Sequence, residues 1–237
     1  MIDKSLLVSQ AAELGVKIDD VAADRFDKYA QMLVETNKTL NLTAITEPDE
    51  IVSKHFVDCL SVFNFVDFPE GAKVIDVGTG AGFPGVVLLI ARPDLNITLL
   101  DSTKKRLGFV EAVVGELGLA AEIVHMRAEE AGKADDYREQ YDIALARAVA
   151  NMQTLSEYCL PFIKKGGIFA AMKGAKAAQE LEAAQGAVRK LGGEIIKSEE
   201  FTLPLCGERT ILKVIKISQT PPKYPRPSAQ ISKKPLE

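Results

Sequence analysis

The segment Ile75-Asp76-Val77-Gly78-Thr79-Gly80-Ala81-Gly82-Phe83-Pro84-Gly85 decides the fold of this chain. An apolar run over residues 73–77 leads into a turn with three alternating glycines, and the pattern predicts a helix that begins at Pro84. Glycine adopts positive φ readily and lets a ligand approach backbone amides without a Cβ in the way. Strand–turn–helix units of this kind receive nucleotide-like cofactors, so the segment predicts a cofactor site.

Strands and helices alternate along the chain after this segment. The pattern predicts strands over residues 73–77, 96–100, 121–126, 141–146 and 167–172, and helices over 84–91, 103–118, 151–163 and 175–191. Regular alternation predicts an α/β fold with a doubly wound, mostly parallel sheet and right-handed crossovers. Two later segments, 194–203 and 210–218, predict a C-terminal antiparallel hairpin, which makes the Rossmann-like sheet seven-stranded.

The residues before the first strand have a different period. Apolar side chains recur at spacings of three and four over residues 22–34, and again over 51–63 after a break at Thr46-Glu47-Pro48-Asp49. This is the period of one helix face. We therefore expect an N-terminal helical cap over residues 1–70, a cofactor-binding core over 71–218, and an extended basic tail over 219–237.

Composition limits the class of protein. The chain has 237 residues, 47% of them hydrophobic and 26% charged, with a net charge of −4, which is ordinary for a globular protein. No apolar run reaches roughly 18 residues and no charged-then-apolar leader is present, so we expect a cytoplasmic protein without a membrane partner. Its three cysteines are far apart, which predicts buried thiols and no metal site.

Two cofactor classes compete for the glycine turn. A dinucleotide site needs G-x-G-x-x-G, but here the third glycine comes one position early and Phe83 stands at the place of the last glycine. Asp76, just before the turn, suits a cationic cofactor better than two phosphates, which favours S-adenosylmethionine. Asp101 ends the second predicted strand, where a carboxylate can accept both ribose hydroxyls; NAD enzymes use the same device.

Short motifs along the whole chain resemble one family, the RsmG (GidB) family of bacterial 16S rRNA guanine-N7 methyltransferases, within the class I S-adenosylmethionine-dependent methyltransferases. The turn is shared by many methyltransferases, but the combination of motifs is specific to this family. The other matching pieces are Asn37-x-x-x-Asn41-Leu42-Thr43, Lys54-His55-Phe56-x-Asp58, Asp101-Ser102 with Lys105-Arg106, Arg127-Ala128-Glu129, Ala146-Arg147-Ala148, Met172-Lys173-Gly174 and Tyr224-Pro225-Arg226.

The resemblance implies that the cofactor contacts fall on Gly78, Phe83, Asp101, Ala128, Glu129 and Arg147. Asp76 and Gly80 are added because they belong to the same turn. The tail departs from the family pattern near Ala229 and Ile231, where a glycine and a second proline are replaced, although Lys233-Lys234-Pro235-Leu236 remains.

The implied reaction places few demands on the protein. Guanine N7 has a free lone pair and no proton to remove, so neither a general base nor a metal is obligatory, and holding the reactants together supplies much of the acceleration. C5 methylation would need a nucleophilic cysteine beside the cofactor, and no cysteine is so placed. The candidates for positioning the base are Asn37, His55, Arg147 and Lys173. For His55, which lies on an apolar helix stripe, a core histidine with local hydrogen bonds is the alternative.

Phosphate binding must be local, because the net charge is negative. Residues 213–237 hold six basic side chains and one acidic one, with Tyr224 as a possible stacking surface. A solubilising tail is the alternative interpretation. The predicted RNA-binding residues are Arg127, Lys173, Arg209, Tyr224, Arg226, Lys233 and Lys234.

The leading hypothesis is therefore methyl transfer from S-adenosylmethionine to a guanine N7 of 16S rRNA, free, in the small ribosomal subunit or in an assembly intermediate. We expect a monomer. The competing hypotheses are an NAD-dependent oxidoreductase and a non-catalytic RNA-binding protein on a methyltransferase fold. We also expect that deletion of residues 223–237 raises the KM for RNA without weakening cofactor binding.

Overall fold

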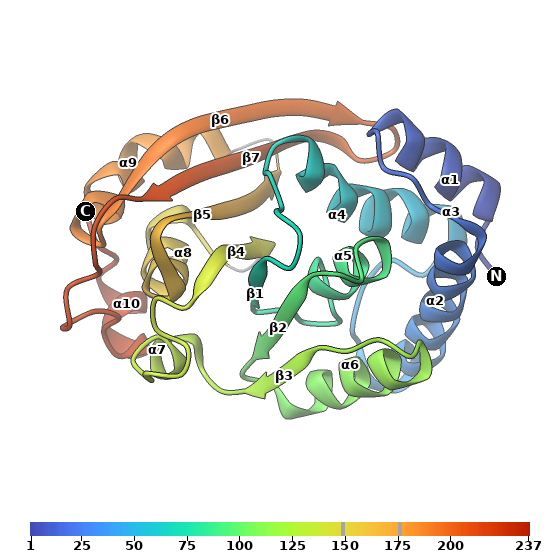
Figure 1. The fold of residues 1–237 in the computed structure, drawn as a ribbon, viewed down its shortest axis with the longest axis horizontal. Coiled ribbons are helices and arrows are strands. Elements are labelled where there is room, and N and C mark those ends of the chain that lie inside the picture. Colours follow the sequence, from blue (N-terminus) through green and yellow to red (C-terminus); the bar gives the residue numbers. More distant parts are fainter. Residues whose placement is uncertain (148–149, 175–176) are drawn as a thin grey trace.

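The computed structural model describes residues 1–147, 150–174 and 177–237 (Figure 1). Ala148 of one motif and residues 175–176 of a predicted helix lie outside the described residues. A single seven-stranded sheet forms the centre, and it confirms the predicted α/β fold. Its strands lie in the order β3 (Glu122–His125), β2 (Asn96–Asp101), β1 (Lys73–Val77), β4 (Tyr141–Arg147), β5 (Ile163–Gly174), β7 (Gly207–Lys216) and β6 (Gly193–Leu203).

Pairing in the sheet follows the predicted arrangement. Strands β1 to β5 are parallel, whereas β7 is antiparallel to both β5 and β6. The chain runs outward from β1 through β2 to β3 and then returns to β4 on the other side of β1. The direction of winding reverses between β1 and β4, and ligands of open α/β sheets bind at the carboxyl ends of the strands at such a point.

Helices cover both faces of the sheet, and the central strands divide their side chains between two apolar clusters. In β1, Val74 belongs to one cluster and Ile75 to the other; in β4, Ile143 and Ala144 divide in the same way. This is the period-two alternation of a strand buried on both faces. The helices of the core are α5 (Gly85–Ala91), α6 (Lys104–Glu116), α7 (Ala128–Ala131), α8 (Met152–Cys159) and α9 (Ala177–Lys190).

The cap packs directly on the core. Phe26, Tyr29 and Phe56 of the cap share one apolar cluster with Val86 of α5 and Leu99 of β2. Figure 1 shows α2 and α4 beside α5. The division into cap, core and tail stays a prediction. The segments of the cap are α1 (Lys4–Glu13), α2 (Asp20–Leu40), α3 (Pro48–Ile51), the π-helix η1 (Val52–Val57), α4 (Asp58–Leu60) and the 3-10 helix η2 (Ser61–Asn64).

The largest difference from the predicted element boundaries lies between α8 and β5. The predicted helix over residues 151–163 ends at Cys159, and a 3-10 turn, η3 (Leu160–Phe162), leads into β5. That strand starts four residues early because it pairs with β4 across an irregularity between Tyr141 and Ile143. The glycines at 166 and 167 fit this irregular stretch: Gly166 has φ +87°, and a Cβ on Gly167 would lie 2.6 Å from the Asp142 carbonyl oxygen.

The prediction of a tail that is extended throughout was wrong. Residues Ser228–Lys233 form helix α10, and three tail side chains, Tyr224, Ile231 and Leu236, are buried. Tyr224 and Leu236 belong to the apolar cluster on the second face of the sheet. Apolar side chains spaced through this proline-rich segment, before, within and after α10, thus dock it on the core. The prediction failed because the surface that receives the tail is far away in sequence.

Candidate functional site

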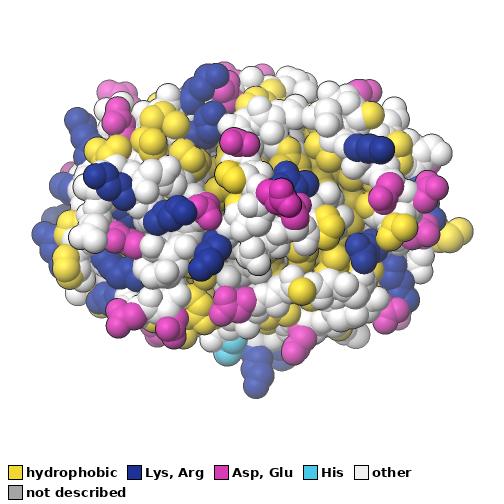
Figure 2. Space-filling view, viewed as in Figure 1, with side chains coloured by type: hydrophobic (Ala, Val, Ile, Leu, Met, Phe, Trp, Pro, Cys, Tyr) yellow, Lys and Arg dark blue, Asp and Glu magenta, His cyan; other side chains and the backbone are white. Residues whose placement is uncertain are grey.

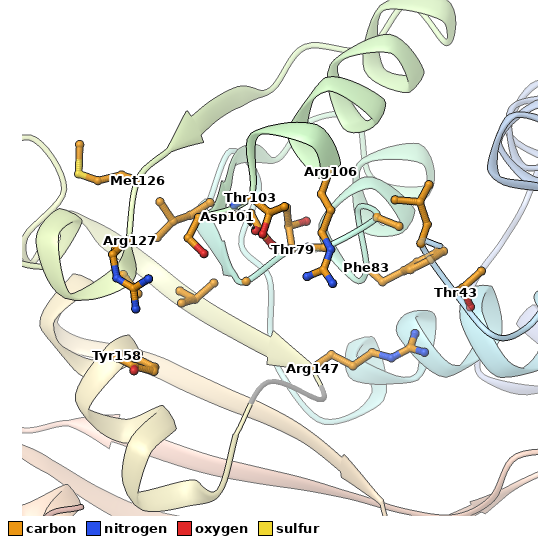
Figure 3. Close-up of a pocket in the computed structure, with 18 of the residues that line it drawn as sticks. Thr43, Thr79, Phe83, Asp101, Thr103, Arg106, Met126, Arg127, Arg147 and Tyr158 are labelled. Atoms are coloured by element: carbon orange, nitrogen blue, oxygen red, sulfur yellow. Dashed lines mark hydrogen bonds between the residues drawn. The ribbon is translucent and has the colours of Figure 1, made fainter. Parts of the chain in front are cut away.

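A pocket of about 430 Å³ opens at the carboxyl ends of β1, β2 and β4 (Figure 3). The glycine turn lines its middle. One end is formed by the β2 and β3 ends and the start of α7, and the other by the cap and the end of β4. The lining includes Thr43, His55, Gly78, Thr79, Gly80, Phe83, Asp101, Thr103, Arg106, Met126, Arg127, Ala128, Glu129, Arg147 and Tyr158.

The three glycines of the turn all have positive φ, at +78°, +60° and +100°. Gly78 and Gly80 line the pocket, so the absence of a Cβ leaves their backbone open to a ligand. Gly82 instead serves packing: a Cβ there would lie 2.7 Å from the Tyr29 hydroxyl and 2.7 Å from Cγ2 of Val86. The turn therefore combines a ligand cradle with a contact to the cap.

Asp76 lies behind the turn. It is fully buried, and its Oδ2 accepts hydrogen bonds from Thr79 Oγ1 at 2.7 Å and from the Gly85 amide at 2.8 Å. Its Oδ1 is buried without a hydrogen-bond partner among the described residues. Burial raises the pKa of Asp76 to about 6. Asp76 does not line the pocket, so a direct cofactor contact by it stays a prediction, while the uncompensated oxygen suits a nearby cation.

Asp101 stands at the end of β2 and lines the pocket. Its two oxygens accept from the Gly80 amide at 2.9 Å and from the Thr103 amide at 2.7 Å, which fixes the carboxylate beside the turn. Each oxygen keeps a lone pair for a ligand hydroxyl. The position matches that of a ribose-binding carboxylate.

Ala128 and Glu129 begin helix α7 beside Asp101 and line the same end of the pocket. Arg127 donates to the Glu129 carboxylate at 2.5 Å. Burial alone would raise the pKa of Glu129, but the Arg127 hydrogen bond opposes it and the net shift is downward. Glu129 is therefore ionised at neutral pH, as an acceptor of ligand hydroxyl or amino groups needs to be.

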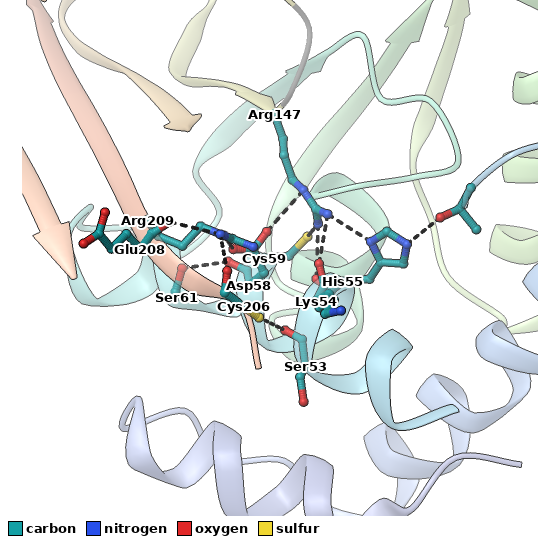
Figure 4. Close-up of polar contacts among 11 residues, drawn as sticks. Ser53, Lys54, His55, Asp58, Cys59, Ser61, Arg147, Cys206, Glu208 and Arg209 are labelled. Atoms are coloured by element: carbon teal, nitrogen blue, oxygen red, sulfur yellow. Dashed lines mark hydrogen bonds and ion pairs between the residues drawn. The ribbon is translucent and has the colours of Figure 1, made fainter. Parts of the chain in front are cut away.

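Arg147 ends β4 and reaches into the cap (Figure 4). Its two Nη atoms make four hydrogen bonds: they donate to the carbonyls of Lys54 and His55, to His55 Nδ1 and to Cys59 Sγ. Nε lies 3.3 Å from Asp58 Oδ2 as an ion pair. The two carbonyls belong to the π-helix η1. The partners of this charge at the end of β4 therefore lie in the cap, about ninety residues earlier in the chain.

His55 lies between Arg147 and Thr43, and all three line the pocket. Its ring stacks on Phe83 with centroids 4.4 Å apart, and its Nε2 lies 2.8 Å from Thr43 Oγ1. Burial, together with the charge of Arg147, lowers the pKa of His55 to about 3. The imidazole is thus neutral and a poor base. His55 is thus a buried histidine with local hydrogen bonds that also lines the pocket, and a role in positioning the base stays a prediction.

The other two base-positioning candidates do not line the pocket. Asn37 holds the following loop: its amide donates to the Thr43 carbonyl and accepts from the Thr43 amide, both at 2.9 Å. Lys173 donates to the Ala150 carbonyl and to Glu180, the latter at 2.8 Å. The structure therefore brings His55 and Arg147 together at the pocket, whereas Asn37 contacts the pocket residue Thr43 without lining the pocket itself.

Several pocket residues were missed by the sequence reasoning, namely Thr43, Thr79, Thr103, Arg106, Met126 and Tyr158. A signal existed for Arg106. Three cations, Lys104-Lys105-Arg106, occupy the first turn of α6 without an acidic residue, where the helix dipole disfavours positive charge. In Figure 3 the Arg106 guanidinium points into the pocket. The threonines carry no comparable signal.

The predicted RNA-binding residues divide into paired and exposed ones. Arg209 donates to Asp58 at 2.7 Å, and Arg226 is paired with the fully buried Glu157. Tyr224 is only 7% exposed, so base stacking there would require the tail to move. Arg127 is half exposed at the pocket, and Lys233 and Lys234 are exposed on α10 and just after it. Figure 2 shows basic and acidic side chains interspersed over one face. An RNA contact by these residues stays a prediction.

No helix in the described part of the chain is both long and apolar enough to cross a membrane. No group of three or more potential metal-binding side chains was found among those same residues.

Comparison with solved structures gives the class. A SAM-dependent O-methyltransferase of Thermotoga maritima superposes with a TM-score of 0.54 at 16% identity, over 79% of this chain and 72% of that one. TrmN of Thermus thermophilus superposes with a TM-score of 0.53 at 16% identity, over 70% and 53%. At these identities the likeness concerns the fold, which, with the glycine turn and Asp101, is that of a Rossmann-like methyltransferase.

Comparison with protein sequences gives the family. The sequence profile described as rRNA small subunit methyltransferase G, GidB, matches residues 22–209. Ribosomal RNA small subunit methyltransferase G of Alkaliphilus metalliredigens is 46% identical over the full length of both chains. Its counterpart in Halalkalibacterium halodurans is 48% identical over 94% of this chain and 95% of that one. The chain belongs to the GidB family, which confirms the resemblance seen in its motifs.

Proposed function

We propose that the protein transfers the methyl group of S-adenosylmethionine to N7 of a guanine in small-subunit 16S rRNA. Family membership supports rRNA methylation and the use of this cofactor. The observation that carries the proposal is one continuous pocket that runs from Asp101 and Glu129, past the glycine turn, to His55 and Arg147. Neither an oxidoreductase nor a non-catalytic protein has support from the family.

The residues present fit the cofactor. Gly78 and Gly80 leave room for close approach, Asp101 offers carboxylate lone pairs to a ribose, and the uncompensated Oδ1 of Asp76 lies buried behind the turn. Asp101, Ala128 and Glu129 would hold the nucleoside, and Phe83 would border the methionine portion. When bound, S-adenosylmethionine supplies a methyl group that is already activated as an electrophile.

The protein's own groups suit an acceptor that needs no deprotonation. His55 is a weak base whose Nδ1 accepts from Arg147 at 2.9 Å, and its pKa is lowered to about 3, so it is not available to remove a proton. Burial raises the pKa of Cys59 to about 12, so this thiol is not an activated nucleophile. What remains is positioning, which is what attack by a free lone pair requires.

Charge at the pocket rim supports RNA binding. Lys104 and Lys105 are exposed and Arg106 lines the pocket, so α6 presents three adjacent cations where a phosphate backbone would approach. Phosphate contacts carry affinity without reading sequence. We propose that these side chains, with Lys233 and Lys234, hold the RNA near the pocket.

The test of the function is methyl transfer with a defined product. The full chain is incubated with methyl-labelled cofactor and either free 16S rRNA or small subunits that lack the modification. N7-methylguanine is then located by reduction and strand scission. Asp101→Asn is the matched control, because it keeps the shape of the side chain but removes the charge. Absence of label from both RNA forms would refute the proposal.

The tail needs a finer test than deletion. Removing residues 223–237 would also remove Arg226 from the buried Glu157 and expose the apolar cluster to which Tyr224 and Leu236 belong. Double variants are therefore preferable: Lys233→Gln with Lys234→Gln, and Lys104→Gln with Lys105→Gln. Each double variant should weaken RNA binding. The slope of the logarithm of the binding constant against the logarithm of the salt concentration should become shallower by about one unit for every phosphate that is no longer neutralised. Lys17→Gln, in a separate groove, is the control.

A further inference from the structure

Thr43 is held in place from several directions at the cap end of the pocket. It lies in the loop between α2 and α3 and lines the pocket (Figure 3). The Asn37 amide clamps its backbone with two 2.9 Å hydrogen bonds. Its side chain is partly buried and contacts His55. Because the Thr43 hydroxyl is fixed beside the pocket, its hydrogen-bond partners determine whether it can donate to a ligand or accept from one.

Arg147 sets the tautomer of His55. A guanidinium can only donate, and Nη2 of Arg147 lies 2.9 Å from His55 Nδ1, so Nδ1 must be the acceptor and carries no proton. A neutral imidazole then carries its proton on Nε2. Because Nε2 lies 2.8 Å from Thr43 Oγ1, the ring donates to the hydroxyl.

The Thr43 hydroxyl can accept no further hydrogen bond. Its oxygen has two lone pairs, and these receive the His55 Nε2–H and the Ile45 amide, which lies 3.0 Å away. Its own hydrogen remains, and no hydrogen bond from it to a protein acceptor occurs among the described residues. The chain from Arg147 through His55 thus turns an ordinary hydroxyl into a donor only.

The geometry assigns Thr43 as a ligand-binding residue that donates to an acceptor oxygen in the pocket. This inference rests on the proposed function, which places two such oxygens here: the carboxylate of the methionine portion and O6 of the target guanine, which neighbours N7. A neutral donor suits this place, because the methylated base becomes cationic and an adjacent free cation would oppose the reaction. Arg147 contributes through His55, with its own donors already engaged.

The variants that test this are Thr43→Val, which removes the hydroxyl at constant shape, and Thr43→Ser, which keeps it. Calorimetry measures binding of S-adenosylhomocysteine and of its decarboxylated analogue, and single-turnover methylation of small subunits measures the RNA step. If the acceptor is the carboxylate, Thr43→Val weakens S-adenosylhomocysteine roughly ten- to hundredfold. The decarboxylated analogue is then affected much less.

If the acceptor is guanine O6, cofactor binding is unchanged and single-turnover methylation slows roughly two- to tenfold. Thr43→Ser should resemble the wild type in either case. The inference is overturned if Thr43→Val matches the wild type in both measurements, or if Thr43→Ser is as defective as Thr43→Val.

A second measurement needs no variant at Thr43. The chain has two histidines, His55 and His125, so nitrogen-15 NMR of the full-length protein with His125→Asn as an assignment aid reports the His55 tautomer. A proton on Nε2 is expected, and a proton on Nδ1 would overturn the inference. If the wild type methylates no RNA, the proposed function fails by itself, while calorimetry and the tautomer still test the Thr43 donor.

Discussion

Replacing Arg147 by lysine tests how much the Arg147 guanidinium adds to the apolar packing that holds the cap on the core. Lysine keeps the charge but has three N–H donors on a single nitrogen, whereas Arg147 makes four hydrogen bonds and an ion pair from a planar fork. At least two buried acceptors of the π-helix region would be left without their donor. Each acceptor left unsatisfied costs about 1–3 kcal/mol, so the free energy of unfolding should fall by about 2–6 kcal/mol.

A decrease of this size is a large part of the total stability of a typical domain, which is about 5–15 kcal/mol. Equilibrium urea unfolding followed by circular dichroism measures it, and the midpoint should fall by about 1 M or more. The matched control is Arg127→Lys, because Arg127 is also paired with a carboxylate at the pocket but is 51% exposed. Its destabilisation should stay below about 1 kcal/mol. Equal midpoints for the two variants would refute the reasoning.

Three further predictions concern buried groups. Burial lowers the pKa of Lys216 to about 8, so the native state loses this proton at a lower pH than the unfolded state does. Between pH 8 and pH 10.5 the free energy of unfolding of the wild type, measured with urea and compared with that of Lys216→Met, should therefore rise by up to about 3 kcal/mol. Burial raises the pKa of Asp76 to about 6, so the ligand-free protein should become less stable from pH 4 to pH 6 when it is compared with Asp76→Asn. Over the same range, calorimetry should show that S-adenosylhomocysteine binds more tightly as the pH rises in the wild type, but not in the variant. Gly82→Ala should destabilise the protein by about 2 kcal/mol or more, because the added Cβ would meet Tyr29 and Val86. Its control is Gly108→Ala in α6, where the Cβ would meet open space and the effect should be neutral or stabilising. Thermal melts measure both.

The sequence predicted those parts of the fold that depend on local periodicity. Strands β1 and β2 alternate or run apolar over five or six residues, and their ends carry Asp76 and Asp101, so the cofactor pocket could be located from them. Arg147, at the end of the apolar strand β4, was a candidate through the motif Ala146-Arg147-Ala148. What the strand could not show was the partner, since Asp58 and His55 lie about ninety residues away.

Features that depend on distant contacts were not predictable. Residues 52–57 read as an ordinary amphipathic helix, and a π-helix there is stabilised by Arg147 and by the Cys206 thiol, which donates to the Ser53 carbonyl at 3.0 Å. The basic segment over residues 213–237 was predicted to bind phosphate or to be a solubilising tail, yet Arg226 pairs with the buried Glu157, and Lys216 at the end of β7 is buried and donates to the carbonyls of Leu160 and Ile163.

The arrangement of charge separates two needs that conflict in an enzyme of this kind. RNA phosphates require exposed cations, but a cation free to contact the base would oppose the positive charge that develops on it. In this protein Lys104 and Lys105 are exposed at the rim and Arg106 lines the pocket, whereas Arg147 is largely covered, has Asp58 as its counter-charge and uses both of its Nη atoms in hydrogen bonds to the cap. At the cap end of the pocket the Thr43 hydroxyl and the His55 ring are neutral, with Thr43 as the donor. The π-helix takes part in this scheme, because its Lys54 and His55 carbonyls accept hydrogen bonds from the Arg147 guanidinium close to the pocket.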